Sequence, residues 1–316
     1  MRILITREIP FDVENYFKSY DVIYNKSSAQ MPREELVEKI SGVDAVITML
    51  SDRVDKEVID AGKNLKVIAN YAVGYNNIDV KYATEKGIMV CNTPDVLTET
   101  TAELGFALMI SVARRIVEAH KFVEDGKFMG WKPSLMLGLD LYGKTLGVFG
   151  FGKIGQALAR CSKGFNMNII YHSRNRNIQG EILTGAEYSS FERLLEESDF
   201  LVVTAPLTDE TKHKFTLNEF KKMKRSAIFV NIGRGPIHKE EDLFLALKEG
   251  VIAGAGLDVF EEEPKINGGL FTLSNVIMLP HIGSASTETR MAMGKLCCDS
   301  VLSVIEKGEK PANVVN

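Results

Sequence analysis

The chain of 316 residues lacks most features that mark secreted, membrane or disulfide-rich proteins. It has four cysteines and no C-x-x-C pair, and Cys297 and Cys298 are sequence neighbours, a poor geometry for a disulfide. This usage predicts reduced thiols in a cytoplasmic protein. No apolar run approaches the length of a membrane span, and the N-terminus lacks the apolar core of a signal peptide.

Strong charge of one sign is also missing. The formal net charge is −4, so nothing indicates a nucleic acid or an anionic membrane surface as a partner. An anionic substrate would therefore have to be bound by a few local positive groups. Histidine is scarce as well, and no two of the five stand at metal-ligand spacing, so we expect no metal site.

The apolar runs are short and alternate with helical patterns, which is typical of α/β folds with parallel sheets. A first series has strands expected at residues 2–6, 22–24, 45–49, 66–71 and 89–91, with helices at 32–40 and 55–61. A second has strands at 145–149, 168–171, 200–204, 227–232, 252–257 and 276–279, with helices at 191–197, 218–223 and 239–249. The length favours two domains.

Two long helical patterns suggest how the domains divide. Residues 97–126 read as one helix, apolar over much of its circumference, which indicates a buried crossover or a dimer face. The last helix, at about 288–307, is too long for another unit of the second sheet, and we expect it to return to the first. The domains would then be residues 1–97 plus 284–316, and residues 98–283.

A glycine motif stands at the start of the second series. Gly150, Gly152 and Gly155 have the spacing G-x-G-x-x-G, after a strand free of charge and before an apolar-faced helix. Such glycines allow a tight turn, close approach of backbone to a pyrophosphate, and close packing of helix on strand. A structural glycine turn is the alternative, but the strand–turn–helix context favours a dinucleotide site.

The next strand ends in a basic turn rather than an acidic one. An NAD site usually has an Asp or Glu here for the ribose, but no acid lies between Phe165 and Gln179. Arg174 and Arg176 could instead bind the 2′-phosphate of NADP. A solvated polar loop is the alternative. We favour NADP(H), with NAD(H) as the second choice.

Three charged residues follow three different strands of the second series. Arg234, Glu263 and His281 should all lie where ligands bind in open parallel sheets, at the carboxyl ends of the strands. The histidine could donate a proton to a carbonyl as hydride arrives, the glutamate could hold its tautomer, and the arginine could bind a carboxylate. Taken singly, each of the three could be a surface group. The other four histidines do not belong to such a set of charged residues at strand ends, and we take them as surface or structural residues.

Four segments together resemble the D-2-hydroxyacid dehydrogenase family: 150–155, 231–235, 258–264 and 280–284. Within it, residues 71–79 and the Ser173–Arg174 turn resemble the glyoxylate/hydroxypyruvate reductase branch. The resemblance runs almost end to end. It implies two Rossmann-like doubly wound parallel-sheet domains, a discontinuous substrate domain and a central dinucleotide domain, with the active site in the cleft between them. It also implies a homodimer built through the dinucleotide domain.

Site residues follow from the resemblance by position. It implies Arg234, Glu263 and His281 as the catalytic residues, and Val73 and Gly74 as substrate-binding residues beside Arg234 and His281. The cofactor-binding residues that it implies are Thr98, Gly150, Phe151, Gly152, Lys153, Ile154, Gly155, Ser173, Arg174, Asn175, Ile232, Gly233, Arg234, Asp258, His281 and Gly283. Asp258 would hold the nicotinamide amide, and His172, where NAD-preferring members carry an acid, puts an NAD preference in doubt.

The sequence therefore predicts a cytoplasmic NAD(P)H-dependent reductase of small 2-oxo acids, glyoxylate or hydroxypyruvate first. One alternative is another substrate on the same fold, such as D-lactate or 3-phosphoglycerate. Another is a non-catalytic dinucleotide sensor that binds a partner. The presence of all the catalytic residue types argues against the sensor.

Overall fold

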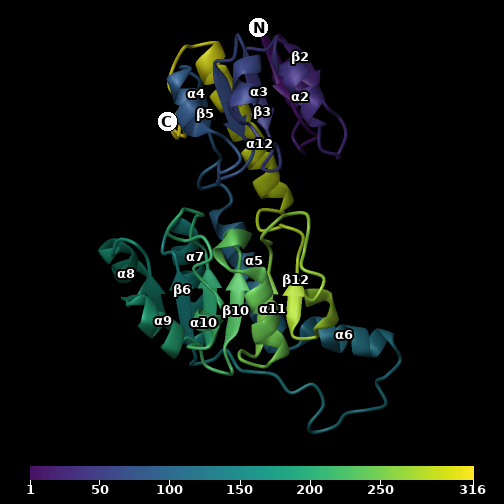
Figure 1. The fold of residues 1–316 in the computed structure, drawn as a ribbon, viewed down its shortest axis with the longest axis vertical. Coiled ribbons are helices and arrows are strands. Elements are labelled where there is room, and N and C mark those ends of the chain that lie inside the picture. The colour runs from purple at the N-terminus through teal and green to yellow at the C-terminus, as the bar shows by residue number, and fades with distance from the viewer. The chain divides into compact units, whose positions relative to one another are not determined.

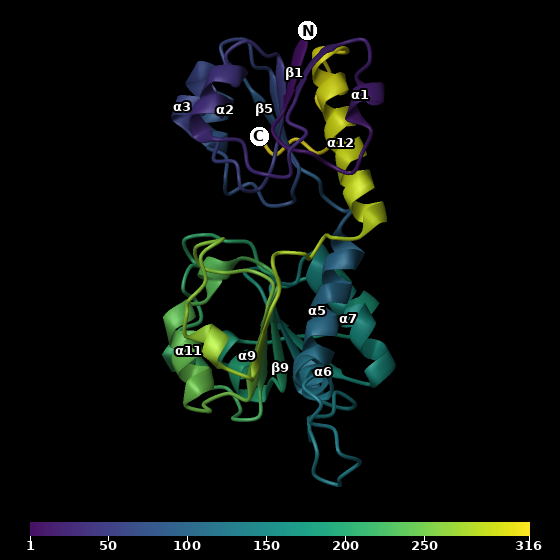
Figure 2. The same ribbon diagram turned by 90° about the vertical axis from the view of Figure 1, so that its right-hand side faces the viewer.

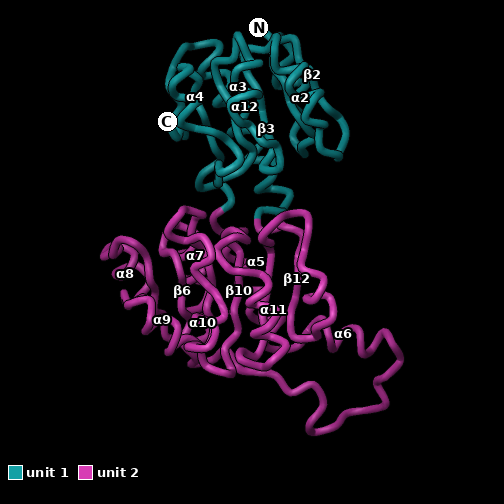
Figure 3. The backbone as a smooth tube through the Cα atoms, in the orientation of Figure 1, with its two compact units in different colours: residues 1–97, 284–316 teal, residues 98–283 magenta.

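The computed structural model describes residues 1–316, and they separate into two compact units, each with its own parallel sheet. Unit 1 comprises residues 1–97 and 284–316, and unit 2 comprises residues 98–283 (Figure 3). The α/β fold class predicted from the sequence is confirmed. No helix in the chain is both long and apolar enough to cross a membrane.

The sheet of unit 1 has five parallel strands in the order β2-β1-β3-β4-β5 (Figure 1). The strands are β1 (Arg2–Ile5), β2 (Asp21–Tyr24), β3 (Ala45–Thr48), β4 (Val67–Asn70) and β5 (Met89–Cys91). The helices are α1 (Val13–Tyr16), α2 (Arg33–Ile40), α3 (Lys56–Ala61), α4 (Val80–Glu85) and α12 (Thr287–Ile305). Strands β3 and β4 are buried throughout, as uncharged strands covered on both faces should be.

The sheet of unit 2 has seven parallel strands in the order β12-β11-β10-β9-β6-β7-β8. They are β6 (Thr145–Phe149), β7 (Asn168–His172), β8 (Glu187–Tyr188), β9 (Phe200–Val203), β10 (Ile228–Asn231), β11 (Gly254–Leu257) and β12 (Val276–Met278). Strand β6 pairs with β7 on one side and β9 on the other. The strand order therefore reverses at β6, and such switch points are where doubly wound sheets bind ligands.

Helices cover both faces of this second sheet, as Figure 2 shows for α5 and α7 on one side and α9 and α11 on the other. The helices of unit 2 are α5 (Thr98–Ala113), α6 (Ile116–Glu124), α7 (Lys153–Ser162), α8 (Ile178–Thr184), α9 (Phe191–Glu197), α10 (Leu217–Phe220) and α11 (Glu240–Lys248), with short 3₁₀ turns at Lys163–Phe165, Gly235–Ile237 and Leu270–Thr272. Each face has its own apolar core.

The predicted single helix over 97–126 is wrong. The structure breaks it into α5 and α6 at Arg115, whose φ of 54° is left-handed and cannot continue a helix. The carbonyl of Ala113 accepts the N–H of Leu139 instead of a helical one. The residue that bonds to the last turn of α5 thus comes from a later part of the chain. A local sequence pattern cannot predict such a contact.

Candidate active site

The glycine turn after β6 is built as its spacing requires. Gly150 has a φ of +95°, and a Cβ there would lie 2.6 Å from the backbone of Ala205. A Cβ on Gly155 would lie 2.5 Å from the carbonyl oxygen of Gly150. Both positions therefore need glycine, the first for its backbone conformation and the second for close packing of helix α7 on the turn.

Gly152 meets a different requirement. A Cβ on it would touch nothing within 4 Å, and α7 begins there with no side-chain cap. The positive end of a ten-residue helix thus faces open space over the turn. A pyrophosphate fits this cradle, since backbone N–H groups at a helix start bind anions. Lys153 and Ile154 form the first turn of the helix, whereas the ring of Phe151 stacks on buried Tyr171 with 3.9 Å between ring centroids.

The turn after β7 contains two arginines with different surroundings. Arg176 donates to both oxygens of Glu181, at 2.8 Å each, and these bonds help lower the pKa of Glu181 to about 2. Arg174 is exposed and makes no hydrogen bond or ion pair. The turn itself is closed by the Ser173 hydroxyl, which donates to the carbonyl of Asn175 at 2.7 Å. Only Arg174 is therefore available to a ligand.

Arg234 follows β10 in a loop that packs beneath the glycine turn. A Cβ on Gly233 would lie 2.8 Å from the carbonyl of Ala205, the residue that also touches Gly150. Ile232, before it, is buried and packs against α5 at Gly105. The glycine turn and the Arg234 loop are thus neighbours on one edge of the sheet.

The guanidinium of Arg234 is largely without partners. Its one hydrogen bond within the chain goes to the carbonyl of Gly233, at 2.7 Å. Burial lowers the pKa of Arg234, although the nearby Glu263 carboxylate opposes that effect. A partly buried guanidinium with unused donors is a binding site for a planar anion such as a carboxylate.

Glu263 and His281 form a direct pair. Nδ1 of His281 lies 2.8 Å from Oε2 of Glu263, while the other oxygen accepts the backbone N–H of Phe260 at 3.0 Å. Burial alone would raise the pKa of Glu263, but the bonds to His281 and Phe260 and the charge of Arg234 outweigh it and lower that pKa. An ionised Glu263 fixes Nδ1 as the protonated nitrogen and leaves Nε2 for a substrate.

Asp258, at the end of β11, holds the segment that carries His281. Its two oxygens accept the N–H groups of Ile282 and Gly283, both at 2.7 Å. His281 has a left-handed φ of 54°, so this anchoring maintains a backbone conformation that histidine rarely adopts. Burial raises the pKa of Asp258.

The structure therefore brings together most of the predicted site residues within unit 2, and Thr98 begins helix α5 of that unit. Val73 and Gly74 belong to unit 1. Their carbonyls accept from the side chains of Asn92 and Asn70, at 2.8 and 2.9 Å, while no acceptor is bonded to their N–H groups. This leaves two adjacent backbone donors without an acceptor in unit 1.

Two histidines of unit 2, taken from the sequence as surface or structural, have specific partners. Nε2 of His213 lies 2.6 Å from Glu261, and His238 is fully buried against Asn231, whose amide donates to its Nδ1 at 3.0 Å. Asn231 also donates to the carbonyl of Arg234. His213 and Glu261 are far apart in the sequence, so no local motif could have paired them.

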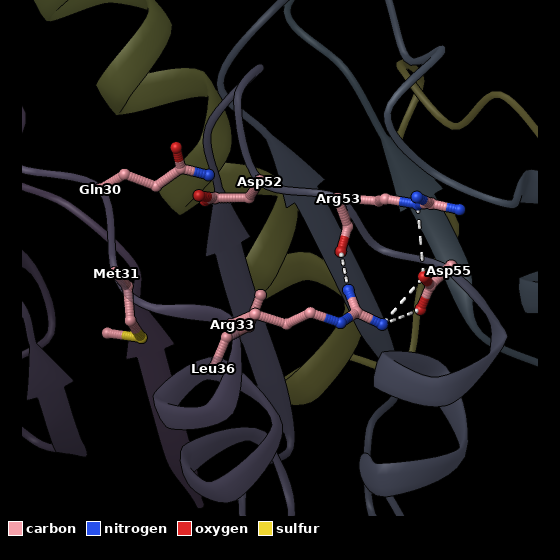
Figure 4. A pocket seen from close by; sticks show the side chains of 7 residues that line it. All are labelled: Gln30, Met31, Arg33, Leu36, Asp52, Arg53 and Asp55. Atoms are coloured by element: carbon pink, nitrogen blue, oxygen red, sulfur yellow. Dashed lines mark hydrogen bonds and ion pairs between the residues drawn. The ribbon is translucent and has the colours of Figure 1, made fainter.

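A hollow in unit 1, of about 270 Å³, offers much less chemistry (Figure 4). Arg33 donates to both oxygens of Asp55, at 2.8 and 2.9 Å, and Asp52 accepts the hydroxyl of Thr6 and the N–H of Met49. Its charged side chains are thus already bonded to other groups of unit 1.

Comparison with known proteins gives consistent matches. A profile described as "D-isomer specific 2-hydroxyacid dehydrogenase, NAD binding domain" matches residues 106–283. The chain is 49% identical to a glyoxylate reductase of Pyrococcus furiosus and 51% identical to one of Thermococcus litoralis, covering all of this chain and 95% and 96% of those proteins. It also resembles the crystal structure of an NADPH-dependent glyoxylate/hydroxypyruvate reductase from Sinorhizobium meliloti in complex with NADP and malonate. The TM-score is 0.87 at 32% identity, covering 99% of this chain and 96% of that one.

Proposed function

The chain belongs to the D-isomer specific 2-hydroxyacid dehydrogenase family, and on this premise we propose that it reduces glyoxylate and hydroxypyruvate with NADPH. It is an NAD(P)H-dependent reductase of small 2-oxo acids. The observation that carries the proposal is the His281–Glu263 pair at 2.8 Å, with the largely unpartnered guanidinium of Arg234 beside it.

The roles of the residues follow from this geometry. A nicotinamide, when bound, supplies the hydride that the carbonyl carbon accepts. Nε2 of protonated His281 donates the proton to the carbonyl oxygen, and Glu263 stabilises the protonated ring through Nδ1. Arg234 binds the substrate carboxylate and polarises the carbonyl. Because the reduction consumes one proton, which His281 delivers, it should be slower in alkali than at neutral pH.

Further substrate contacts are assigned to unit 1. We propose that the N–H groups of Val73 and Gly74 donate to the substrate carboxylate, because their carbonyls are already bonded and their N–H groups are not. We also propose that the Asp258 carboxylate accepts a hydrogen bond from the nicotinamide amide. Each of its oxygens accepts one backbone N–H and has a further lone pair free for this bond.

The cofactor preference is assigned to the turn after β7. Arg174 is exposed and unpaired beside the Ser173 hydroxyl, a combination suited to a 2′-phosphate. His172 occupies the place of the ribose-binding acid, and its ring is turned to the carbonyl of Ser189. These features support NADPH over NADH.

Helix α6 and the loop after it support a homodimer. The helix buries none of its residues, and the loop to β6 carries Phe128, Met129 and Trp131, of which Met129 is 86% exposed. A groove of about 570 Å³ is lined by parts of α5, α6 and β12 and by residues 137–139 of the same loop. The chain has no membrane-spanning helix. An exposed apolar surface of this kind therefore favours the packing of a second copy of the chain against it. Four free cysteines support a cytoplasmic location.

Two measurements test the proposal. NADPH absorbance should fall with glyoxylate and hydroxypyruvate, and more slowly with pyruvate or 3-phosphohydroxypyruvate. Absence of NADPH or NADH oxidation with every 2-oxo acid would reject the reductase. Light scattering should give the mass of a dimer, and Met129→Asp with Trp131→Asp should give that of a monomer. A dimer that survives both substitutions would reject this interface.

A further inference from the structure

The loop that carries Glu263 is held at both ends by one buried carboxylate. Glu240, the first residue of α11, is 5% exposed. Its carboxylate accepts the backbone N–H of Glu261, at 3.0 Å, and the backbone N–H of Asn267. Residues 261–267 are therefore closed onto a single side chain, with Glu263 between the two attachment points.

The side chain of Glu261 in turn bonds to the backbone of Glu240. One of its oxygens accepts the N–H of Glu240 at 2.9 Å, where α11 has no cap from its own N-terminal residue. The other accepts from Nε2 of His213 at 2.6 Å. Burial would raise the pKa of Glu261, but the bonds from Glu240 and His213 outweigh it and lower that pKa. Two carboxylates thus lie close together, stabilised by backbone donors, an imidazole and the positive end of a helix.

This arrangement touches the site on two sides. The N–H of Phe260, the residue before Glu261, donates to Glu263 at 3.0 Å. A Cβ on Gly235 would lie 1.7 Å from the carbonyl oxygen of Phe260, so the Arg234 loop runs directly against the same segment. Any movement of Glu261 would therefore reach both Glu263 and the Arg234 loop.

We propose that Glu240, Glu261 and His213 form a clasp that positions Glu263 against His281 and thereby sets the pH range of the reduction. The proposal rests on the reductase function above. The titratable groups that face Glu261 are Glu240, His213 and buried His238, and those that face Glu263 are His281, Arg234 and Asp258. With the clasp closed, Glu263 is held 2.8 Å from Nδ1 of His281 and stabilises the protonated ring. With the clasp open, that stabilisation weakens.

The test compares Glu240→Gln with Glu262→Gln. The amide of Glu240→Gln keeps the shape but turns an N–H group toward one of the two backbone donors. We expect turnover at neutral pH to fall about tenfold, because small displacements of acid–base groups are costly. The pH at half-maximal turnover should move down by about half a unit or more, with NADPH affinity within about twofold of the unaltered chain. Glu262, on the same loop, contacts only Lys265, so Glu262→Gln should change neither quantity.

His213 gives a second pair of variants that leaves the core intact, because its side chain is 37% exposed. His213→Ala should move the pH profile in the same direction by a smaller step, and His213→Gln, which keeps an N–H donor, should restore it. Profiles of Glu240→Gln and His213→Ala that superimpose on that of the unaltered chain would overturn the clasp.

Failure of the clasp and failure of the reductase assignment can be told apart. An unaltered chain that oxidises no NADPH with any 2-oxo acid overturns the proposed function. Hydrogen exchange then decides whether the clasp exists: the N–H groups of Glu261 and Asn267 exchange faster in Glu240→Gln if it does. Unchanged exchange at both overturns it.

Discussion

The two parallel sheets of this chain carry polar groups at their carboxyl edges, but the two sets are used differently. In unit 1, Thr6 donates to Asp52 and Thr48 donates to Asn70 at 3.1 Å, so these four buried groups satisfy one another. In unit 2 the α7 N-terminus opens onto free space, and Arg234 keeps most of its donors unused. A satisfied polar group indicates a structural role, whereas an unsatisfied one at a strand end indicates a ligand.

The largest effect should come from His281→Ala. Loss of the proton donor should lower turnover by about 10²–10⁴, whereas NADPH affinity should change little, because the glycine cradle for the pyrophosphate stays intact. Stopped-flow turnover and fluorescence titration of NADPH measure the two quantities. The control is His120→Ala, which removes an exposed histidine paired only with Glu124. Undiminished turnover in His281→Ala would remove it from the mechanism.

Arg234→Lys tests whether substrate binding needs the two parallel N–H donors of a guanidinium. Lysine keeps the charge but loses bidentate geometry, so kcat/KM for glyoxylate should fall about a hundredfold. Arg225→Lys, at an exposed position of the same unit, serves as the control. A fall in NADPH affinity with unchanged KM for glyoxylate would place Arg234 at the cofactor instead.

Acid should weaken unit 2 through His238, the one group there that is fully buried with an unpartnered nitrogen, Nε2. Burial lowers the pKa of His238 to about 4. Between the ordinary value near 6.5 and about 4, the unfolded chain holds a proton that the folded chain lacks, so the free energy of unfolding falls as pH falls. The loss should reach about 3 kcal/mol by pH 4. Denaturant unfolding at pH 7 and 5 should show a smaller difference in His238→Gln, and an equal one would contradict the assignment.

Arg174→Ala and Arg176→Ala separate a free arginine from a paired one. Arg174→Ala should weaken NADPH by about tenfold or more and leave NADH unchanged, since only NADPH carries the 2′-phosphate. Arg176→Ala, whose guanidinium is bonded to Glu181, should affect the two cofactors equally. Dissociation constants by calorimetry make the comparison, and equal loss of both cofactors in Arg174→Ala would overturn the phosphate assignment.

The smallest effect belongs to the satisfied Thr6–Asp52 pair of unit 1. Thr6→Val removes the hydroxyl that bonds Asp52 but keeps the shape of the side chain, and should lower the free energy of unfolding by about 1 kcal/mol. Turnover with glyoxylate should not change at a temperature where both the variant and the unaltered chain are fully folded. A turnover loss without a stability loss would show that the Thr6–Asp52 pair, too, serves a ligand.

Features of the fold that depend on a local sequence pattern could be predicted. The strands, the glycine turn and the strand ends bearing Arg234, Glu263 and His281 follow from apolar runs and their endings, and the parallel topology then places those ends on one edge. The break at Arg115 and the short edge strand β8 could not be predicted, because residue 139 and the neighbouring strand β7 determine them. The clasp depends on pairs 21 and 48 residues apart, which no periodicity encodes.

A crystal structure of the chain with NADP⁺ and oxamate, an unreactive analogue of a 2-oxo acid, tests the central claim most directly. We expect the carboxylate of oxamate on the guanidinium of Arg234, its carbonyl oxygen within hydrogen-bond reach of Nε2 of His281, and the pyrophosphate over Gly152. Oxamate bound away from Arg234 and His281, with NADP⁺ in the glycine cradle, would contradict the account.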